Sequence, residues 1–260
     1  MKTAVCLSGH VRYFNKVLPN FIKVFSQLSP DVFIHTWENA GYQIRNSGYQ
    51  HENEVAADFS FVEKLSDHGI VIRNMVVENE NMGMLFIEDG KYKQQVKVPN
   101  KNILSMFRKV ELANNLKKEY ESKNKFEYDI VFKCRFDMLF QTGLLENEIE
   151  NVLENKALIY VPCKGLQHPE KIRQINDHFA FGSSESINYY SDLYSKIDSY
   201  YSNDVPVPPM VTEENCGIHS ETLLNFHMKP ARTSISVLET QVAYILPHKH
   251  ASIISKFQNF

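Results

Sequence analysis

The hydrophobic positions near the start of the chain change their period twice. Residues 3–7 form a short apolar run that stops at a Ser-Gly-His turn, as expected of a buried strand. Apolar positions then recur at helical spacing between residues 18 and 28, and a β-branched and aromatic run covers residues 31–37. Strand, helix and strand in this order predict a βαβ unit, which implies neighbouring parallel strands.

The rest of the chain continues this alternation. A long amphipathic helix is predicted over residues 103–120, and it leads into an apolar run at residues 128–137 that is typical of a central strand. The polar tract between residues 37 and 55 is interpreted as a surface loop, and residues 79–101 as either a hairpin or a flap over a site. Further helices are predicted at residues 55–65, 145–153, 187–197 and near 220, and further strands at residues 70–77, 157–161, 178–181, 234–238 and 242–245.

No internal repeat or linker interrupts the pattern. We therefore expect a single α/β domain over residues 1–260, in which helices flank a mostly parallel central sheet. A hydrophobic content of 43% is ample for a packed core of this kind.

Charge and composition narrow the classes of partner. A net charge of -3 and a pI near 6.4 leave no basic footprint of the kind that nucleic-acid phosphates select, so no nucleic acid partner is expected. No run approaches the roughly 20 apolar residues of a membrane-spanning helix, and the N-terminal segment lacks the features of a signal peptide. We expect no transmembrane segment, whereas the oligomeric state does not follow from the sequence.

The cysteines indicate the redox compartment. They are widely scattered, and two of them lie in apolar runs that are predicted to be buried strands. This pattern is typical of reduced thiols in a cytoplasm rather than of a disulfide framework or a zinc site. The four are Cys6, Cys134, Cys163 and Cys216.

Two predicted strand ends carry the strongest candidate chemistry, because ligands of open α/β sheets gather at the carboxyl ends of the strands. The first holds Ser8, Gly9, His10 and Arg12, which offer backbone N–H groups to a phosphate or base and a guanidinium to a diphosphate. The alternative is an ordinary turn with a solvated arginine.

The second strand end holds Asp137, a carboxylate that follows an otherwise apolar run. An unpaired charge at that place is costly without a cation, a donor or water. Asp137 is therefore the leading single candidate for a functional residue, and the alternative is a carboxylate that Arg135 or Lys133 neutralises or that is simply exposed.

At this point the sequence resembles the glycosyltransferases of the GT-A fold, especially small ones of bacterial surface-polysaccharide clusters and large DNA viruses. The resemblance consists of weakly specific segments that follow one another in the expected order across most of the chain. They are LSGHVR, DVFIHTW, SMFRKVELANNL, YDIVFKCRFDMLF, NDHFAFGSSE and HSETLLNFH. The resemblance implies a Rossmann-like GT-A fold.

The resemblance also implies a metal site. The family's Asp-x-Asp motif holds Mn²⁺ or Mg²⁺ against the donor diphosphate, and the matching triplet here is Arg135-Phe136-Asp137. Only its last residue matches, so Arg135 would either neutralise phosphate itself or pair with Asp137. Some members use a C-terminal histidine as a further metal ligand, and His248 follows the last predicted strand at a compatible place; a solvated tail is the alternative.

Acceptor binding and catalysis are assigned in the same way. Asp177 precedes a segment similar to the acceptor-side segment of the family, which implies a role in acceptor binding or proton removal. Glu221, near the start of a late helix, is similar to the general base of inverting enzymes, with Glu213 and Glu214 as fallback candidates. A glutamate in a first helical turn is also favoured by the helix dipole alone.

Two further residues are candidates for donor or acceptor contacts. Arg108, with Lys109, lies in the long predicted helix, whose N-terminal amides would face the donor phosphates; an exposed basic face is the simpler account. Trp37 is a candidate for stacking on a sugar or base, although aromatic residues at such spacing usually belong to a core.

The implied function is transfer of a sugar from a nucleotide-sugar donor to a glycan acceptor, metal-assisted and with inversion. One alternative is a non-catalytic domain of the same fold that binds a nucleotide or carbohydrate. Another is a methyltransferase or dehydrogenase, which the missing G-x-G-x-x-G fingerprint disfavours. A metal-dependent phosphoesterase would require a cluster of carboxylates and histidines that the sequence does not display.

Overall fold

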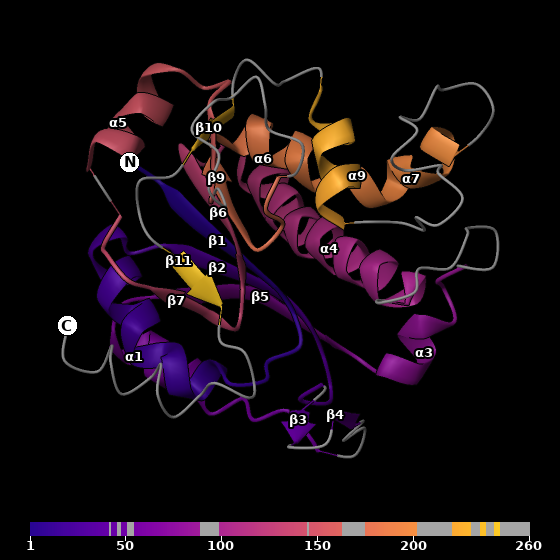
Figure 1. The fold of residues 1–260 in the computed structure, drawn as a ribbon. Coiled ribbons are helices and arrows are strands. Elements are labelled where there is room, and N and C mark those ends of the chain that lie inside the picture. The colour runs from indigo at the N-terminus through magenta and orange to yellow at the C-terminus, as the bar shows by residue number, and fades with distance from the viewer. Residues whose placement is uncertain are drawn as a thin grey trace.

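The structure is a computed structural model, and it describes residues 1–41, 43–45, 48–50, 55–88, 99–144, 146–162, 175–201, 220–229, 235–237 and 242–244. A seven-stranded sheet lies at its centre, with the strand order β5-β2-β1-β6-β9-β8-β10 (Figure 1). The strands are β1 (Thr3–Gly9), β2 (Asp31–Trp37), β5 (Val71–Glu78), β6 (Ile130–Arg135), β8 (Ile159–Val161), β9 (Phe179–Gly182) and β10 (Ile235–Val237).

The sheet is mostly parallel, as the sequence predicts. β1 pairs in parallel with β2 and β6, β2 with β5, and β8 with β10. The exception is β9, which runs antiparallel to both β6 and β8. The prediction of an α/β fold with a mostly parallel sheet flanked by helices is therefore confirmed, whereas a single domain over residues 1–260 stays a prediction because that range includes residues outside the described part.

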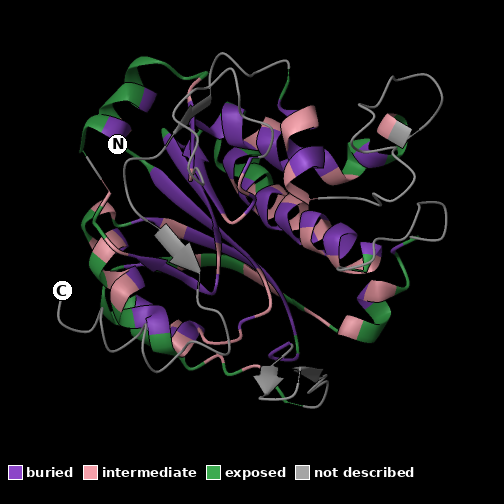
Figure 2. Ribbon diagram, viewed as in Figure 1, coloured by how far each residue is buried: buried purple, intermediate pink, exposed green. Residues whose placement is uncertain are grey.

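Helices cover both faces of the sheet, which is largely buried between them (Figures 1 and 2). Alternate strand residues supply the two cores. Val5 and Leu7 of β1 pack in one core with α1, α2 and α5, whereas Ala4 and Cys6 pack in the other with α4, α6, α7 and α9. The first three helices are α1 (Phe14–Phe25), α2 (Phe61–Asp67) and α5 (Glu146–Glu154), and the second four are α4 (Asn100–Asn124), α6 (Ser184–Ser191), α7 (Leu193–Tyr201) and α9 (Ser220–His227).

The described residues contain smaller elements at the margins of the sheet. A 3-10 turn, η1 (Ser26–Leu28), follows α1, and the short helix α3 (Glu80–Met84) follows β5. β7 (Met138–Phe140) pairs antiparallel with β11 (Val242–Tyr244), and β3 (Gln43–Arg45) forms a hairpin with β4 (Gly48–Gln50). The buried thiols of Cys6 and Cys134 are unpaired, as expected of reduced cysteines, while Cys163 and Cys216 lie outside the described residues.

The strand order creates a topological switch point. Strands β1, β2 and β5 progress along the sheet in one direction, and β6 then joins the other side of β1, which is the order of the doubly wound nucleotide-binding folds. Ligands of such sheets bind outside the carboxyl ends of the strands on either side of the switch. The segments that follow Gly9 and Arg135 meet at this place, and β9 begins beside them because Phe179 pairs with Cys134.

Several predicted boundaries were wrong. The strand predicted over residues 128–137 is shorter in the structure, because β6 begins at Ile130 and ends at Arg135; a turn follows, and β7, which was not predicted, then joins a second small sheet. Phe136 hides the turn in the sequence pattern, since it is an apolar residue that packs against Phe14 and Phe61 in the core. The predicted helix at 187–197 is likewise two helices that meet at Asp192.

The polar stretches contain more structure than predicted. The tract after residue 37 holds the β3–β4 hairpin, and α2 begins at Phe61 rather than near residue 55. Within 79–101, residues Glu80–Met84 are helical and α4 already begins at Asn100, while residues 89–98 lie outside the described part of the chain. Asn79 starts α3 because its side-chain oxygen accepts the N–H of Met82 at 3.0 Å.

Candidate functional site

Two arginines converge on one carboxylate at the switch point. Asp137 Oδ1 accepts the Nε–H of Arg135 at 2.8 Å, and Oδ2 accepts Nη2 of Arg135 at 2.8 Å and Nη1 of Arg12 at 3.0 Å. Arg135 is the last residue of β6, whereas Arg12 belongs to the loop after β1. We call Arg12, Arg135 and Asp137 the arginine–aspartate cluster.

The carboxylate of this cluster is more deeply buried than its two guanidinium groups. The Asp137 side chain is 4% exposed, whereas those of Arg12 and Arg135 are 27% and 21% exposed. Burial alone would raise the pKa of Asp137, but the charge and hydrogen bonds of Arg135, together with Arg12 and His178, hold that pKa below its usual range. The carboxylate therefore stays ionised beneath two guanidinium groups that form the more exposed part of the cluster.

A second buried carboxylate lies next to the cluster. Asp177 Oδ1 is 3.3 Å from Nε2 of His178, its backbone oxygen accepts the ammonium of Lys133, and its side chain is hydrogen-bonded to Ser220. Burial opposes ionisation of Asp177, but its neighbours His178, Lys133 and Arg135 lower its pKa. Burial and Arg135 lower the pKa of His178 to about 4, so its ring is neutral at pH 7.

The contact with Ser220 brings the start of α9 to the same edge of the sheet. Glu221 is the next residue, is half-buried in the first turn of α9, and accepts the backbone N–H of Ile175 at 3.2 Å through its own backbone oxygen. The structure thus places Asp177 and the first turn of α9 together, as a role for both residues in one site requires.

The loop after β1 has the backbone geometry of a tight, anchored turn. Gly9 has φ 100°, a conformation that side chains disfavour, and its carbonyl accepts the hydroxyl of Thr36 at 2.7 Å. Arg12 also has a positive φ, 43°. Ser8 is buried and lies opposite Arg135 in the β1–β6 register, so the loop and the arginine–aspartate cluster are parts of one arrangement.

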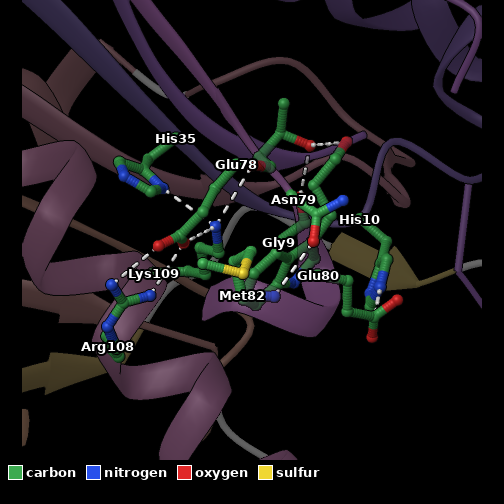
Figure 3. A network of polar contacts seen from close by, with 11 residues as sticks. Gly9, His10, His35, Glu78, Asn79, Glu80, Met82, Arg108 and Lys109 are labelled. Atoms are coloured by element: carbon green, nitrogen blue, oxygen red, sulfur yellow. Dashed lines mark hydrogen bonds and ion pairs between the residues drawn. The ribbon is translucent and has the colours of Figure 1, made fainter. Parts of the chain in front are cut away.

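Arg108 and Lys109 do not lie at a helix terminus, because α4 begins at Asn100. Both pair with Glu78, the last residue of β5 (Figure 3). Arg108 binds its two oxygens at 2.8 Å each, and Lys109 binds it at 2.6 Å. Lys109 is buried, so an exposed basic face is the wrong account of this pair.

The same network fixes Trp37 and His35. Lys109 lies 3.3 Å above the centre of the Trp37 ring and 3.1 Å from Nδ1 of His35, and it also donates to the backbone oxygen of Thr36. Trp37 is 1% exposed and therefore belongs to the core, where it is not available to stack on a ligand. Burial lowers the pKa of Lys109 to about 8, and Glu78 opposes that shift.

His10 connects the two regions of the site edge. Its Nε2 is 3.3 Å from Glu80 Oε1 in α3 (Figure 3). Its ring centre is 6.0 Å from that of Trp37. Burial lowers the pKa of His10 despite the carboxylate of Glu80. Glu80 also accepts the side-chain amide of Asn39, so the ends of β1, β2 and β5 are joined by polar contacts.

The sequence reasoning missed the network around Glu78. Glu78 and Asp137 share one signal, an acidic residue at or just after the carboxyl end of a strand-like run. The pairing of Glu78 with Lys109 could not be inferred from the sequence, because Lys109 lies 31 residues away on a helix that shows no local sign of the pairing.

The donor groups around Asp137 do not fit a divalent cation. Both carboxylate oxygens are engaged by guanidinium groups, and a metal ion there would lie against two fixed positive charges. Within the described ranges no group of three or more His, Cys, Asp or Glu side chains is arranged to hold a metal ion. The expected second ligand, His248, lies outside the described residues.

No protein-family model matches the sequence, and no curated protein matches it. Among solved structures, one described as a glucose-1-phosphate thymidylyltransferase from Bacillus anthracis with bound sucrose is similar, with a TM-score of 0.44 and 12% identity over 100% of this chain and 94% of that one. A likeness at this level does not identify an activity. In the described part of the chain, no helix is both long and apolar enough to cross a membrane.

Proposed function

We propose that the chain is a glycosyltransferase of the GT-A fold that binds a nucleotide-sugar donor at the switch point and passes the sugar to a glycan acceptor. The observation that carries the proposal is the convergence of Arg12 and Arg135 on the buried Asp137. Guanidinium groups held by a carboxylate beneath them form a rigid site for phosphate oxygens, which prefer bidentate arginine contacts. The resemblance of the sequence segments supports the same reading.

The local balance of charge favours an anionic ligand. Arg12, Arg135 and Lys133 face Asp137 and Asp177, and the neutral ring of His178 adds no charge at pH 7. The two guanidinium groups carry the more exposed charge of this cluster, in a region that lies at the carboxyl ends of parallel strands. A nucleoside diphosphate linked to a sugar meets that charge with its phosphates and leaves the sugar toward the segment before β9.

The transfer reaction requires a base on the acceptor side. An acceptor hydroxyl attacks the anomeric carbon, the bond from that carbon to the diphosphate oxygen breaks with its electron pair on the leaving group, and the hydroxyl proton goes to a carboxylate. We propose Glu221 as this base and Asp177 as a residue that positions the start of α9, since Asp177 contacts Ser220. Arg12 and Arg135 stabilise the charge on the leaving diphosphate.

Donor hydrolysis by the purified protein tests the proposal, because slow hydrolysis needs no acceptor. A panel of UDP-, GDP-, dTDP- and CMP-sugars is incubated with Mn²⁺, Mg²⁺ or EDTA, and the released nucleotide is quantified for the native chain and for Asp137→Ala. We expect release of one nucleotide that depends on Asp137. Binding without release in any buffer would favour the non-catalytic domain. The absence of both binding and release would refute the proposal.

A further inference from the structure

We infer that Arg12 and Arg135 take the place of a divalent cation at the donor diphosphate, so that donor binding does not depend on metal. The inference rests on the proposed function and specifies which groups hold the leaving diphosphate. Asp137 is then a positioning residue for the two guanidinium groups and not a metal ligand.

Both carboxylate oxygens of Asp137 are already engaged in hydrogen bonds with arginines. The two carboxylate oxygens receive three charge-assisted bonds at 2.8 to 3.0 Å, two from the planar edge of Arg135 and one from Arg12. A metal ion that bound Asp137 would have to displace at least one guanidinium group and would remain beside both. The carboxylate of Asp137 is thus bound by the two arginines.

The two arginines of the cluster are more exposed to solvent than its carboxylate. Asp137 is nearly inaccessible at 4%, whereas both arginine side chains retain more than a fifth of their surface. A ligand that approaches the cluster therefore meets guanidinium groups before it meets the carboxylate. Cationic groups in front and an anionic group behind form an arrangement for binding phosphate, and the reverse order would be needed for binding a metal ion.

The conformation and hydrogen bonding of Arg12 also favour an anionic ligand. Its positive φ of 43° is held between the Gly9 turn and α1, and the buried Nε atom of its guanidinium has no hydrogen-bond partner among the described residues. A buried donor without an acceptor is costly, and a phosphate oxygen is an acceptor that would satisfy it. Arg12 lies in the loop after β1 and Arg135 ends the neighbouring strand β6, and both bind the same carboxylate, so one diphosphate can contact both.

Nucleotide affinity measured by titration calorimetry tests the inference. UDP, GDP, dTDP and the corresponding nucleotide-sugars are titrated into the full chain in EDTA and in Mn²⁺. We expect the dissociation constant to change less than about twofold between the buffers, and Arg12→Gln and Arg135→Gln each to weaken binding about tenfold or more. Arg135→Lys, which keeps the charge but loses the planar pair of donors, should bind with intermediate affinity.

Arg73→Gln is the matched control. Arg73 also pairs with a strand aspartate, Asp31 at 2.7 Å, but Asp31 begins β2 and so lies at the amino-terminal ends of the strands, away from the site. Removal of Arg73 should therefore leave nucleotide affinity unchanged. Thermal unfolding of each variant separates a lost contact from a lost fold, because a folded variant with weak binding supports the inference. Direct Mn²⁺ binding, followed by electron paramagnetic resonance, should be equal in the native chain and Asp137→Asn.

Three results would count against these ideas, and they are distinguishable. Nucleotide binding that disappears in EDTA and returns with Mn²⁺ overturns the metal-independent site while the proposed function stands. Mn²⁺ binding that Asp137→Asn abolishes does the same. Absence of nucleotide and nucleotide-sugar binding in both buffers refutes the proposed function, and with it the inference.

Discussion

The two buried aspartates at the switch point are poor proton acceptors for different reasons. Asp137 is saturated by arginines, and Asp177 is held by His178, Lys133 and Ser220. Both have pKa values below the usual range of an aspartate, whereas an effective general base has a pKa near the working pH. Of Asp137, Asp177 and Glu221, Glu221 is therefore the better candidate for the base, and the fallback candidates Glu213 and Glu214 lie outside the described residues.

Glu221→Gln is expected to lower the turnover number for sugar transfer by about 10² to 10⁴ while nucleotide affinity stays unchanged, because only proton removal is lost. Steady-state kinetics with the identified donor and acceptor, combined with calorimetry, measure the two effects separately. Glu185→Gln is the matched control, since Glu185 lies in the first turn of α6 and is exposed. An unaltered turnover number for Glu221→Gln would remove Glu221 from the mechanism.

At the scale of elements, α3 is attached to the sheet through a glycine. A methyl group on Gly83 would approach the ring of Trp37 to 2.4 Å and the carboxyl carbon of Glu78 to 2.7 Å. Neither neighbour can yield easily, because Trp37 is covered by Lys109 and Glu78 is bound to two cations. The contact of α3 with the end of β5 thus depends on the absence of a side chain at this position.

Gly83→Ala is expected to destabilise the protein by about 1 to 3 kcal/mol through overpacking. Urea unfolding followed by circular dichroism measures the change in the free energy of unfolding. Gly143→Ala serves as the control, because a methyl group there meets no atom within 4 Å, and it should change stability by less than about 0.5 kcal/mol. Equal effects of the two substitutions would mean that α3 moves freely away from Trp37.

The sequence pattern predicted long elements well and short ones poorly. The regions of β1, β2 and α4 were found because their apolar periodicity extends over enough residues to be distinctive. The end of β6 was predicted two residues late because the turn after it contains a buried phenylalanine, and the β3–β4 hairpin was missed because three-residue strands carry little periodicity. These failures reflect tertiary packing, which local pattern does not encode.

The candidate site was predictable in its acidic and basic residues but not in their pairing. Asp137, Arg135 and Arg12 were identified from strand ends, and the alternative that Arg135 neutralises Asp137 is the one observed. The contribution of Arg12 depends on a contact across 125 residues, which follows from the parallel pairing of β1 with β6. The disagreement with a metal site became visible only when both arginines were placed on the same carboxylate.

Across the whole molecule, buried ionisable groups make stability depend on pH. Burial, reinforced by Lys109, lowers the pKa of His35 to about 4, and burial with Arg135 does the same for His178. In the unfolded chain both histidines titrate near 6.5, so that state takes up protons first as the pH falls. Despite its burial, Glu78 has a pKa of about 2 because of Arg108 and Lys109, and it adds a loss of stability only below about pH 4.3.

The free energy of unfolding should therefore decrease steadily from pH 7 to pH 4, by about 6 kcal/mol for the two histidines together. Urea denaturation at half-unit pH intervals measures the slope, which is proportional to the difference in bound protons between the unfolded and folded states. His35→Asn should flatten the slope between pH 6.5 and 4 by about one proton, whereas the exposed His68 replaced by asparagine should not. A stability that stays constant or rises as the pH falls from 7 to 5 would show that these histidines are protonated in the folded protein, and the packing of Lys109 against His35 would then have to be rearranged.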